Sequence, residues 1–416
     1  MALSTEALLQ SPFLAGAIAR AGKDADRIDG VRPTLVVEPQ TPEEVATMLA
    51  AASREGLTVV FRGGGTKRGW GRIPAGIDLL ISMRGLARVI AHEHADLTAT
   101  FEAGATLEDV NAALGRHRQW LPLDRSGDGS TIGGAIATND SGPLRHRFGT
   151  PRDLLIGIRL ATTDGRLVKA GGNVVKNVAG YDLGKMMAGS FGTLAAIVSA
   201  TFKLLPMPAA SHTVSAALPD KESAARALVA LNDSQLEPLA VELQAKAGRA
   251  PYRLLARFAT SPSAAAAQAA QAQGLIGAGE IITGDQEAAI WRRYQGRAAA
   301  SAGTVVRMNW LPAALPDVLT LFETLAHANG SVELVARAAL GAGLVRIDGG
   351  IDWQASIVKR LRATDVVRHV TIIDAPPGVK QQIDVWGALG AGGVVATAIK
   401  RELDPAGILN AGRGPI

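Results

Sequence analysis

Runs of apolar residues separated by glycine-rich turns characterise the first half of the chain. The run Leu57–Phe61 predicts a strand, and the runs Leu154–Thr162 and Arg166–Ala170, on either side of Thr163-Asp164-Gly165, predict a β-hairpin. A longer strand is predicted over Thr193–Leu205, because this run is rich in apolar and β-branched residues and ends at a proline. The first half is therefore expected to consist mainly of short strands.

Helix signals are fewer in this half. The pattern Thr41-Pro42-Glu43-Glu44 predicts a helix that runs to about Arg54, because threonine is a good N-cap, proline suits the first helical position and Glu44 has the capping-box spacing. A second helix is predicted over Thr106–His117, where Thr106 precedes two acidic residues in the first turn.

Helices and strands alternate in the second half, after the prolines at positions 206 and 208. The predicted helices cover residues 220–231, 263–273, 285–295 and 315–327. The predicted strands cover residues 211–217, 239–243, 252–258, 280–283, 304–310, 332–335, 344–347 and 366–373. This alternation favours an α+β domain in which helices cover one face of an antiparallel sheet. A length of 416 residues also favours two domains, with the boundary at these prolines.

Composition excludes several classes of protein. The 43 Lys and Arg against 38 Asp and Glu give a net charge of only +5, and aromatic residues make up 4%, so no nucleic-acid partner is expected. The absence of cysteine excludes disulfides, thiolate zinc sites, iron–sulfur clusters and a flavin attached through sulfur within this chain. The first twenty residues lack a basic leader pattern, and no stretch is apolar enough to span a bilayer, so a cytoplasmic protein is expected.

A glycine run follows the strand predicted at Leu57–Phe61. In Arg62-Gly63-Gly64-Gly65-Thr66, successive backbone N–H groups can converge on one anion, and Lys67, Arg68 and Arg72 add positive charge. The segment is neither a P-loop nor a dinucleotide-binding Gly-x-Gly-x-x-Gly motif. It fits a diphosphate, but an ordinary surface turn stays open as the alternative.

A second small-residue segment covers Leu123–Gly142, with five glycines and many small polar side chains. A core segment would need more side-chain volume, and a disordered linker would not carry the apolar Ile132 and Ile136. Backbone exposed to a large flat ligand fits both features. The alternative is a glycine-rich loop packed against other backbone.

These segments and several others resemble, in order and spacing, the FAD-binding domain of the vanillyl-alcohol oxidase/p-cresol methylhydroxylase superfamily. The matching motifs are Arg62–Thr66, Thr131–Gly134, Ala137–Asn139, Arg147–Thr150, Arg152-Asp153, Asn177–Leu183, Gly189–Leu194 and Leu403–Arg413. Within that superfamily the chain is most similar to the FAD-binding (E) subunits of bacterial glycolate oxidases. The resemblance covers about residues 30–206 and 400–416.

The resemblance implies FAD as the cofactor and assigns a binding role to particular residues. The loop that holds the FAD pyrophosphate would be Arg62, Gly63, Gly64, Gly65 and Thr66. The segment along the pyrophosphate and the isoalloxazine would comprise Ser126, Thr131, Gly133, Gly134, Ala137, Asn139 and Gly142. Ile197 would contact the adenine side through its backbone, and Asn410 would return towards the flavin ring. The implied domains are an FAD-binding domain over 1–206, an α+β cap over 207–400 and a closing segment over 401–416.

Two departures from the superfamily pattern matter. Members with a covalent flavin carry His where this chain has Thr66, so non-covalent FAD is expected. Metal-dependent 2-hydroxyacid dehydrogenases carry a His-x-Gly-Asp-Gly-Asn-x-x-His-like run in the second half, whereas here only His212, His327 and His369 follow Met207 and none begins such a run. No metal site and no catalytic base are therefore identified.

The functional expectation is one subunit of a glycolate oxidase or dehydrogenase complex, which oxidises a small 2-hydroxyacid such as glycolate to glyoxylate. Its partners would be a catalytic flavoprotein subunit and an iron–sulfur subunit, since a chain without cysteine cannot supply a cluster. The complex could lie at the inner membrane. Two alternatives stay open: a stand-alone FAD-dependent D-2-hydroxyacid dehydrogenase, and a flavin-binding subunit without catalysis of its own.

Two histidine motifs have simpler explanations than a metal-binding or catalytic role. His92-Glu93-His94 could hold a metal, but between two predicted strands it is typical of a solvated hairpin turn. His146 lies between Arg145 and Arg147 and could face the flavin or an acidic substrate, but a charged loop is the simpler interpretation.

Overall fold

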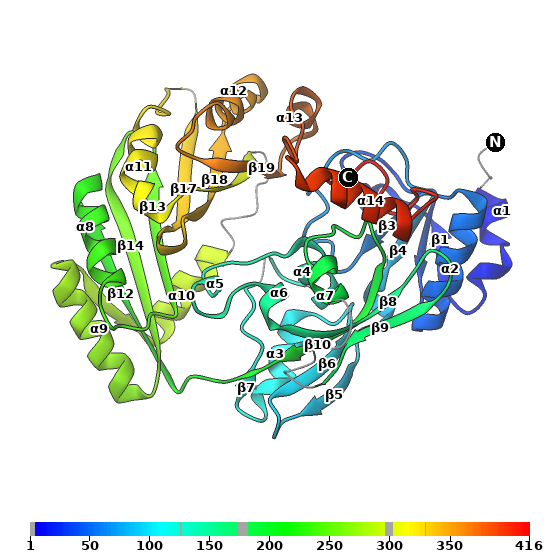
Figure 1. Cartoon of the computed structure of the whole chain (residues 1–416), viewed down its shortest axis with the longest axis horizontal. Helices are drawn as coiled ribbons and strands as arrows, with labels where there is room; N and C mark the ends of the chain where they lie inside the picture. The colour runs from blue at the N-terminus through cyan, green and yellow to red at the C-terminus, as the bar shows by residue number, and fades with distance from the viewer. Residues whose placement is uncertain (1–4, 125–126, 174–181, 296–302, 329) are drawn as a thin grey trace. The chain divides into compact units, whose positions relative to one another are not determined.

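The computed structural model describes residues 5–124, 127–173, 182–295, 303–328 and 330–416 (Figure 1). Internal contacts divide the chain into two compact units. The first unit comprises Met1–Ser141, Gly149–Met207 and Ala388–Ile416. The second comprises Gly142–Phe148 and Pro208–Gly387. Among the described residues, every helix is too short or too polar to cross a bilayer.

The first unit begins with a four-stranded sheet in the order β1-β2-β4-β3. Its strands are β1 (Ile18–Ala21), β2 (Leu35–Glu38), β3 (Val59–Arg62) and β4 (Leu79–Ser82). The strands β2 and β3 each pair with β4 in parallel, and β1 pairs with β2 antiparallel. Parallel neighbours need a crossover, and helix α2 (Pro42–Glu55) connects β2 to β3.

Helix α2 forms where its sequence signals predict. The Thr41 hydroxyl accepts a hydrogen bond from the Glu44 backbone N–H at 3.2 Å, and Gly56, with φ of 66°, ends the helix. Its apolar face, which includes Val45, Met48 and Leu49, is buried in the core of the first unit. That packing fixes the end of β3 and therefore the start of the glycine run.

The second sheet of this unit has five antiparallel strands in the order β5-β6-β10-β8-β9. They are β5 (Val89–Glu93), β6 (Thr98–Glu102), β8 (Leu155–Ala161), β9 (Leu167–Gly171) and β10 (Ala196–Lys203). A short pair joins β7 (Gln119–Trp120) to β11 (Leu205–Pro206). The remaining helices are α1 (Thr5–Leu9), α3 (Leu107–Gly115), α4 (Ile132–Thr138), α6 (Pro151–Leu154), α7 (Leu183–Met187) and α14 (Gly392–Leu403), with 3-10 turns η1 (Pro12–Leu14), η2 (Asp24–Asp26) and η3 (Met83–Gly85).

The second unit is built on one antiparallel sheet of eight strands in the order β15-β12-β14-β13-β17-β18-β16-β19. The strands are β12 (Ala210–Leu218), β13 (Ala240–Lys246), β14 (Arg249–Thr260), β15 (Glu280–Thr283), β16 (Thr304–Asn309), β17 (Ser331–Arg337), β18 (Ala342–Asp348) and β19 (Arg368–Asp374). The helices are α5 (Arg145–Phe148), α8 (Lys221–Asn232), α9 (Pro262–Ile276), α10 (Gly284–Gln295), α11 (Leu315–Glu323), α12 (Ile351–Arg362) and α13 (Pro377–Gln382), with 3-10 turns η5 (Pro312–Ala314) and η6 (Ala338–Leu340).

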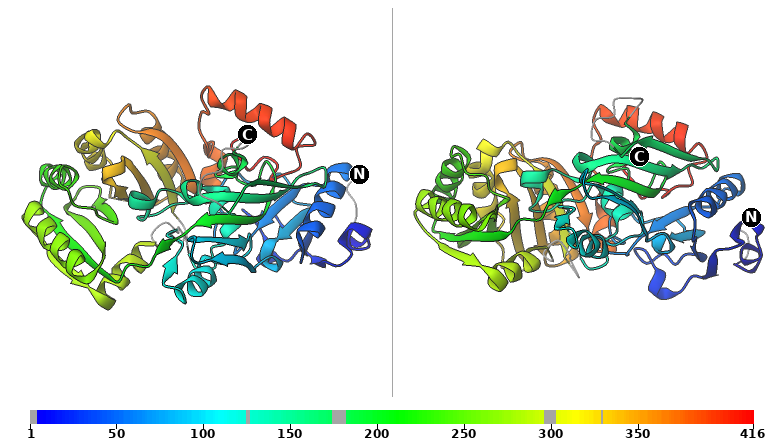
Figure 2. Two further views of the ribbon diagram at one scale, coloured as in Figure 1. Left: turned by 60° about the horizontal axis from the view of Figure 1, so that its bottom comes forward. Right: turned by 90° about the horizontal axis from the view of Figure 1, so that it is seen from below.

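The two faces of this sheet differ. Alternate residues of β14, such as Leu254 and Phe258, share a core with apolar residues of α8, α9, α11 and α12. Figure 2 shows α8 and α9, drawn in green, side by side on that face. Leu255 points the other way and packs with Trp291 of α10. The expected α+β architecture is confirmed, with α10 as a helix on the face that was expected to be uncovered.

The units differ from the expected boundaries in two places. Helix α14 was expected within the cap, but Ile399 and Leu403 pack against the core of the first unit, and Lys400 Nζ donates to the carbonyl oxygen of Thr193 at 2.8 Å. The short segment Gly142–Phe148 was expected in the first domain but belongs to the second unit.

Candidate cofactor-binding site

A groove in the first unit is lined by segments that are distant in sequence. It brings together most of the residues that the sequence singled out: Arg62, Gly63, Gly64, Gly65, Thr66, Thr131, Gly133, Gly134, Ala137, Ile197 and Asn410. The two glycine-rich segments thus share one groove. Asn139 and Gly142 do not line it, and Ser126 lies outside the described residues, as do residues 177–181 of the motif Asn177–Leu183.

The glycines after β3 are required by close packing. A Cβ on Gly63 would lie 2.1 Å from the Thr131 hydroxyl oxygen, and one on Gly64 would lie 1.7 Å from the carbonyl oxygen of Gly129. Both distances are far inside van der Waals contact, so the first loop can lie against the second segment only without side chains at these positions.

The backbone amides of this loop are available to a ligand. Within the described part of the chain, the N–H groups of Gly63, Gly64 and Gly65 donate to no other group. Three successive unpaired amides beside Lys67 and Arg68 provide hydrogen-bond donors and positive charge for a diphosphate. The Lys67 ammonium also forms an ion pair with Asp140 at 3.2 Å and lies 5.5 Å from the centre of the Trp70 ring.

The second segment has a different role, because its amides are already used. The N–H of Gly133 donates to the carbonyl oxygen of Ala103 at 2.8 Å, and that of Gly134 donates to the Thr131 hydroxyl at 3.3 Å, capping α4. Gly133 also has to be small, since a Cβ there would lie 2.9 Å from the Cβ of Ala103. These glycines lie in the first turn of α4, which packs on other backbone and forms a wall of the groove with little side chain.

Asn139 and Gly142 have structural roles elsewhere. Asn139 ends α4 in a left-handed conformation, with φ of 45°, and its side-chain oxygen accepts from the Arg152 N–H at 3.3 Å. Gly142 lies in the second unit, where its carbonyl oxygen accepts from Nε of the buried Arg337 at 2.9 Å.

The closing segment reaches the groove along β3. Leu409 bridges Val59 in parallel, and the Asn410 N–H donates to the Val59 carbonyl at 2.8 Å. Asn410 is buried, and its Oδ1 atom has no hydrogen-bond partner in the described chain. An orphaned buried acceptor in a groove points to a donor on a ligand.

Arg413 joins this segment to the far end of the glycine loop. Its Nη2 atom donates to the carbonyl oxygens of Arg68 at 2.8 Å and Trp70 at 2.7 Å. Burial lowers the pKa of the Arg413 guanidinium to about 10, which still leaves it protonated at neutral pH.

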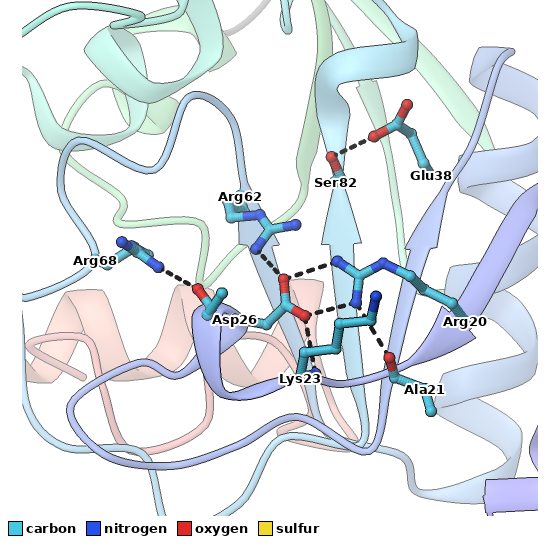
Figure 3. A network of polar contacts seen from close by, with 9 residues as sticks. Arg20, Ala21, Lys23, Asp26, Glu38, Arg62, Arg68 and Ser82 are labelled. Atoms are coloured by element: carbon cyan, nitrogen blue, oxygen red, sulfur yellow. Dashed lines mark hydrogen bonds and ion pairs between the residues drawn. The ribbon is translucent and has the colours of Figure 1, made fainter.

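Arg62 itself points to a buried carboxylate. Its Nη1 atom donates to Asp26 Oδ1 at 2.8 Å, and Asp26 also accepts from Arg20 (Figure 3). The hydrogen bonds from Arg20, followed by those from Arg62 and the Lys23 N–H, lower the pKa of Asp26 well below its ordinary value, against the opposing effect of burial. Asp26 is therefore ionised at neutral pH.

Several lining residues were not singled out by the sequence. Phe191 and Gly192 lie within the motif Gly189–Leu194, so the motif could have identified them. Lys67 and Arg68 were noted as charges but not assigned to the site. Ile28, Phe61, Met83, Ala103 and Ala195 also line the groove, and no local pattern distinguishes them from core residues.

The two histidine motifs lie outside this groove. His92 and His94 are joined by His117, whose ring centre lies 5.1 Å and 4.9 Å from theirs, and His92 Nε2 lies 2.8 Å from the Gln119 side-chain oxygen. His146 lies on α5 in the second unit, where burial, followed by the charge of Arg147, lowers its pKa. Among the described residues, no three His, Asp or Glu side chains are arranged to hold a metal ion.

The groove fits a flavin dinucleotide. Three donor amides can bind a diphosphate, glycines and alanines leave room for a flat ring system, and Asn410 offers an acceptor that the described chain does not use.

The sequence is similar to those of known proteins. Residues 33–171 match the model of a family described as an FAD binding domain. A D-2-hydroxyglutarate dehydrogenase of Xanthomonas citri pv. viticola is 30% identical, over 94% of this chain and 91% of that protein. Glycolate oxidase subunit GlcE of Escherichia coli is 33% identical, over 44% of this chain and 51% of that protein.

The fold is also found among solved structures. An alkyldihydroxyacetonephosphate synthase superposes with a TM-score of 0.69 at 16% identity, over 92% of this chain and 77% of that one. At this identity the likeness concerns the fold alone. The D-2-hydroxyglutarate dehydrogenase, matched along nearly its whole length, decides the family and confirms the expected resemblance. The chain belongs to the vanillyl-alcohol oxidase/p-cresol methylhydroxylase superfamily of FAD-binding proteins and, within it, to the FAD-dependent 2-hydroxyacid dehydrogenases.

Proposed function

We propose that this chain is the FAD-binding subunit of a complex that oxidises a small 2-hydroxyacid, with glycolate as the first candidate and glyoxylate as its product. The first unit would bind FAD without a covalent bond, the second would form the cap, and residues 401–416 would return to the flavin. Electrons would leave through an iron–sulfur subunit, and a second flavoprotein subunit would oxidise the substrate.

The observation that carries the cofactor role is the row of unpaired amides at Gly63, Gly64 and Gly65. Arg68 lines the same groove, together with Arg62, which pairs with Asp26, and Lys67, which pairs with Asp140, so cationic side chains lie beside the amides that would bind a diphosphate. When bound, FAD supplies the two-electron acceptor that oxidation of an alcohol to a carbonyl requires. The chain's own part is to hold that group and to exclude water from it.

Thr66 supports non-covalent attachment. The residue lines the groove at the position where covalent members of the superfamily have His, and its hydroxyl lies 3.4 Å from the Ser130 hydroxyl. A threonine hydroxyl does not form the bond to the flavin that an imidazole forms in those members.

The need for partners rests on the sequence. A chain without cysteine cannot carry an iron–sulfur cluster, so onward one-electron transfer through a cluster needs a second protein. The three histidines of the second half lie on different elements: His212 on β12, His327 beyond α11, where it faces Trp353, and His369 on β19. Their separation in the sequence differs from that of the two histidines in the His-x-Gly-Asp-Gly-Asn-x-x-His-like run of metal-dependent members of the superfamily.

The competing proposal is an independent D-2-hydroxyacid dehydrogenase. It is favoured by the match to the D-2-hydroxyglutarate dehydrogenase, which covers nearly all of both chains. A third proposal, a flavin-binding subunit that takes no part in the chemistry, predicts flavin uptake but no dependence of complex activity on this flavin.

Anaerobic mixing separates these proposals. The purified flavin-loaded chain is mixed with glycolate, D-lactate or D-2-hydroxyglutarate, and the long-wavelength flavin band is followed. The subunit proposal expects no bleaching by the chain alone and bleaching once the flavoprotein and iron–sulfur subunits are added. Rapid bleaching of the isolated chain would support the independent dehydrogenase. Bleaching restricted to the partner's flavin would support the third proposal.

A further inference from the structure

The turn η2 holds a buried carboxylate at the centre of a polar network. Asp26 Oδ2 accepts from Arg20 Nη1 at 2.6 Å and from the Lys23 N–H at 3.0 Å, while Oδ1 accepts from Arg20 Nη2 at 2.9 Å and Arg62 Nη1 at 2.8 Å (Figure 3). Only 4% of Asp26 is exposed. Four donors on one buried carboxylate fix its position and, through it, that of Arg62.

The same turn also reaches the other side of the glycine run. The carbonyl oxygen of Ala25 accepts from Arg68 Nη1 at 2.7 Å. Arg62 and Arg68 flank the three glycines and both line the groove, so two adjacent residues of η2 hold the charged residues at both ends of the loop.

Hydrogen bonds that hold both ends of the loop change the free energy of ligand binding. Glycine backbone and long arginine side chains lose the most conformational entropy when they become ordered. A loop that is ordered before the ligand arrives loses less conformational entropy on binding, and this raises affinity without a new contact.

We infer that Asp26 is a positioning residue for the cofactor: it holds Arg62 and the glycine loop in the geometry that binds the FAD diphosphate, although it does not itself line the groove. This inference rests on the proposed assignment of the groove to FAD. Asp26 acts through Arg62, so its contribution to FAD affinity exists only while Arg62 is present.

Charge alone would give the opposite effect. Removing the negative charge of Asp26 leaves Arg20 and Arg62 with a larger net positive charge, which would strengthen attraction to a diphosphate. However, Arg62 lines the groove and Asp26 does not, and the two are joined by a hydrogen bond of 2.8 Å. The inference expects the loss of positioning to outweigh the loss of repulsion between Asp26 and the diphosphate, so the sign of the change in FAD affinity tests it.

The experiment measures the FAD dissociation constant of the full-length apoprotein by fluorescence titration. Asp26→Asn keeps the side-chain shape and removes the charge, and we expect it to raise the dissociation constant about ten-fold. The matched control is Asp24→Asn in the same turn, because Asp24 is exposed and pairs only with Arg27, at 3.0 Å, among the described residues. The control should change the dissociation constant by less than about two-fold.

A double-mutant cycle separates positioning from a general loss of structure. In an Arg62→Ala background, Asp26→Asn should leave the dissociation constant unchanged, whereas a purely structural role would lower affinity in both backgrounds. If Asp26→Asn does not fold, Arg20→Met tests the same point, because Arg20 holds Asp26 and does not line the groove. It should raise the dissociation constant by a smaller factor.

The outcomes are distinct. A wild-type chain that binds FAD, together with an Asp26→Asn variant that binds it equally or more tightly, would overturn the inference and leave the groove assignment intact. Equal effects of Asp26→Asn in both backgrounds would also overturn it. A wild-type chain that takes up no FAD would overturn the groove assignment, and this inference with it.

Discussion

The side-chain amide of Asn410 donates a hydrogen bond to the backbone carbonyl oxygen of Phe191, 219 residues earlier in the chain. Both residues have left-handed backbones, with φ of 46° for Asn410 and 60° for Phe191, and both line the groove. The contact attaches the C-terminal segment to the loop before β10, and the second polar atom of the Asn410 side chain, Oδ1, is left buried without a hydrogen-bond partner among the described residues.

Substitution of Asn410 tests this contact. Asn410→Ala removes the hydrogen bond. It also puts alanine in a left-handed conformation that asparagine tolerates better, so we expect the free energy of unfolding to fall by about 2 kcal/mol. Asn410→Gly removes the same bond but tolerates the backbone, and should be less destabilising than the alanine variant. Urea denaturation of both variants measures the difference. Equal stability of wild type and Asn410→Ala would contradict a stabilising role for this contact.

Because the two glycine segments approach closely, one added methyl group at Gly64 should weaken FAD binding. Gly64→Ala puts a Cβ 1.7 Å from the Gly129 carbonyl oxygen, so the loop must move and its amides lose their alignment. We expect the FAD dissociation constant to rise at least about ten-fold. Gly76→Ala is the control, because a Cβ there meets nothing within 4 Å. Flavin titration of both variants tests this, and unchanged affinity in Gly64→Ala would argue against the amides as the diphosphate site.

A buried ion pair anchors the closing segment. Lys400 Nζ contacts the carboxylate of Asp404, whose side chain is fully buried, and Asp404 also accepts from the Leu409 N–H at 2.9 Å. Lys400→Met leaves that carboxylate without its partner, so we expect a loss of about 3–5 kcal/mol of stability.

The exposed pair Arg166–Asp164 provides the comparison for Lys400→Met. Its side chains are 75% and 49% exposed, so Arg166→Met should change stability by less than about 1 kcal/mol. Chemical denaturation of the two variants measures both changes. Similar losses in the two would show that burial of the Lys400–Asp404 pair is unimportant.

Stability should depend on pH through Asp26. Hydrogen bonds from Arg20 and then Arg62 lower the pKa of Asp26 in the folded chain below its ordinary value of 3.8. A carboxylate of this kind stabilises the fold at every pH above its unfolded pKa, and the contribution is lost as pH falls through its folded pKa. We expect the stability difference between wild type and Asp26→Asn to be constant from about pH 7 to 5 and to shrink below about pH 4. Urea denaturation at several pH values checks this, and a difference that grows on acidification would refute it.

Much of the fold could be predicted from local signals. The capped helix α2, the β8–β9 hairpin and the helices α8 and α9 lie where N-caps, turn residues and periodicity indicate. The helices α12 and α14 were not predicted. Helix α14 begins in the glycine-rich run from Gly390 to Gly393, which weakens the helical signal, and α12 follows Gly349-Gly350 without a side-chain cap.

The candidate site was accessible to sequence reasoning only in part. Glycines show where backbone must approach closely, so Gly63 and Gly64 could be identified, and small-residue motifs indicated Gly133 and Ala137. Asp26 could not be identified, because its importance comes from Arg62, thirty-six positions later, and no spacing rule connects them. From the sequence, Ile28 and Met83 cannot be distinguished from ordinary core residues, since lining a groove and filling a core require the same apolar side chains.

The flavin content of the purified chain tests the central claim most directly. Absorbance of the native protein, followed by acid or heat precipitation, shows whether FAD is present and whether it is attached. We predict a yellow protein that carries about one FAD per chain, with all the flavin released into the supernatant. A colourless chain that takes up no added FAD would contradict the claim that the glycine-lined groove holds the cofactor, and flavin that stays with the precipitate would contradict non-covalent binding beside Thr66.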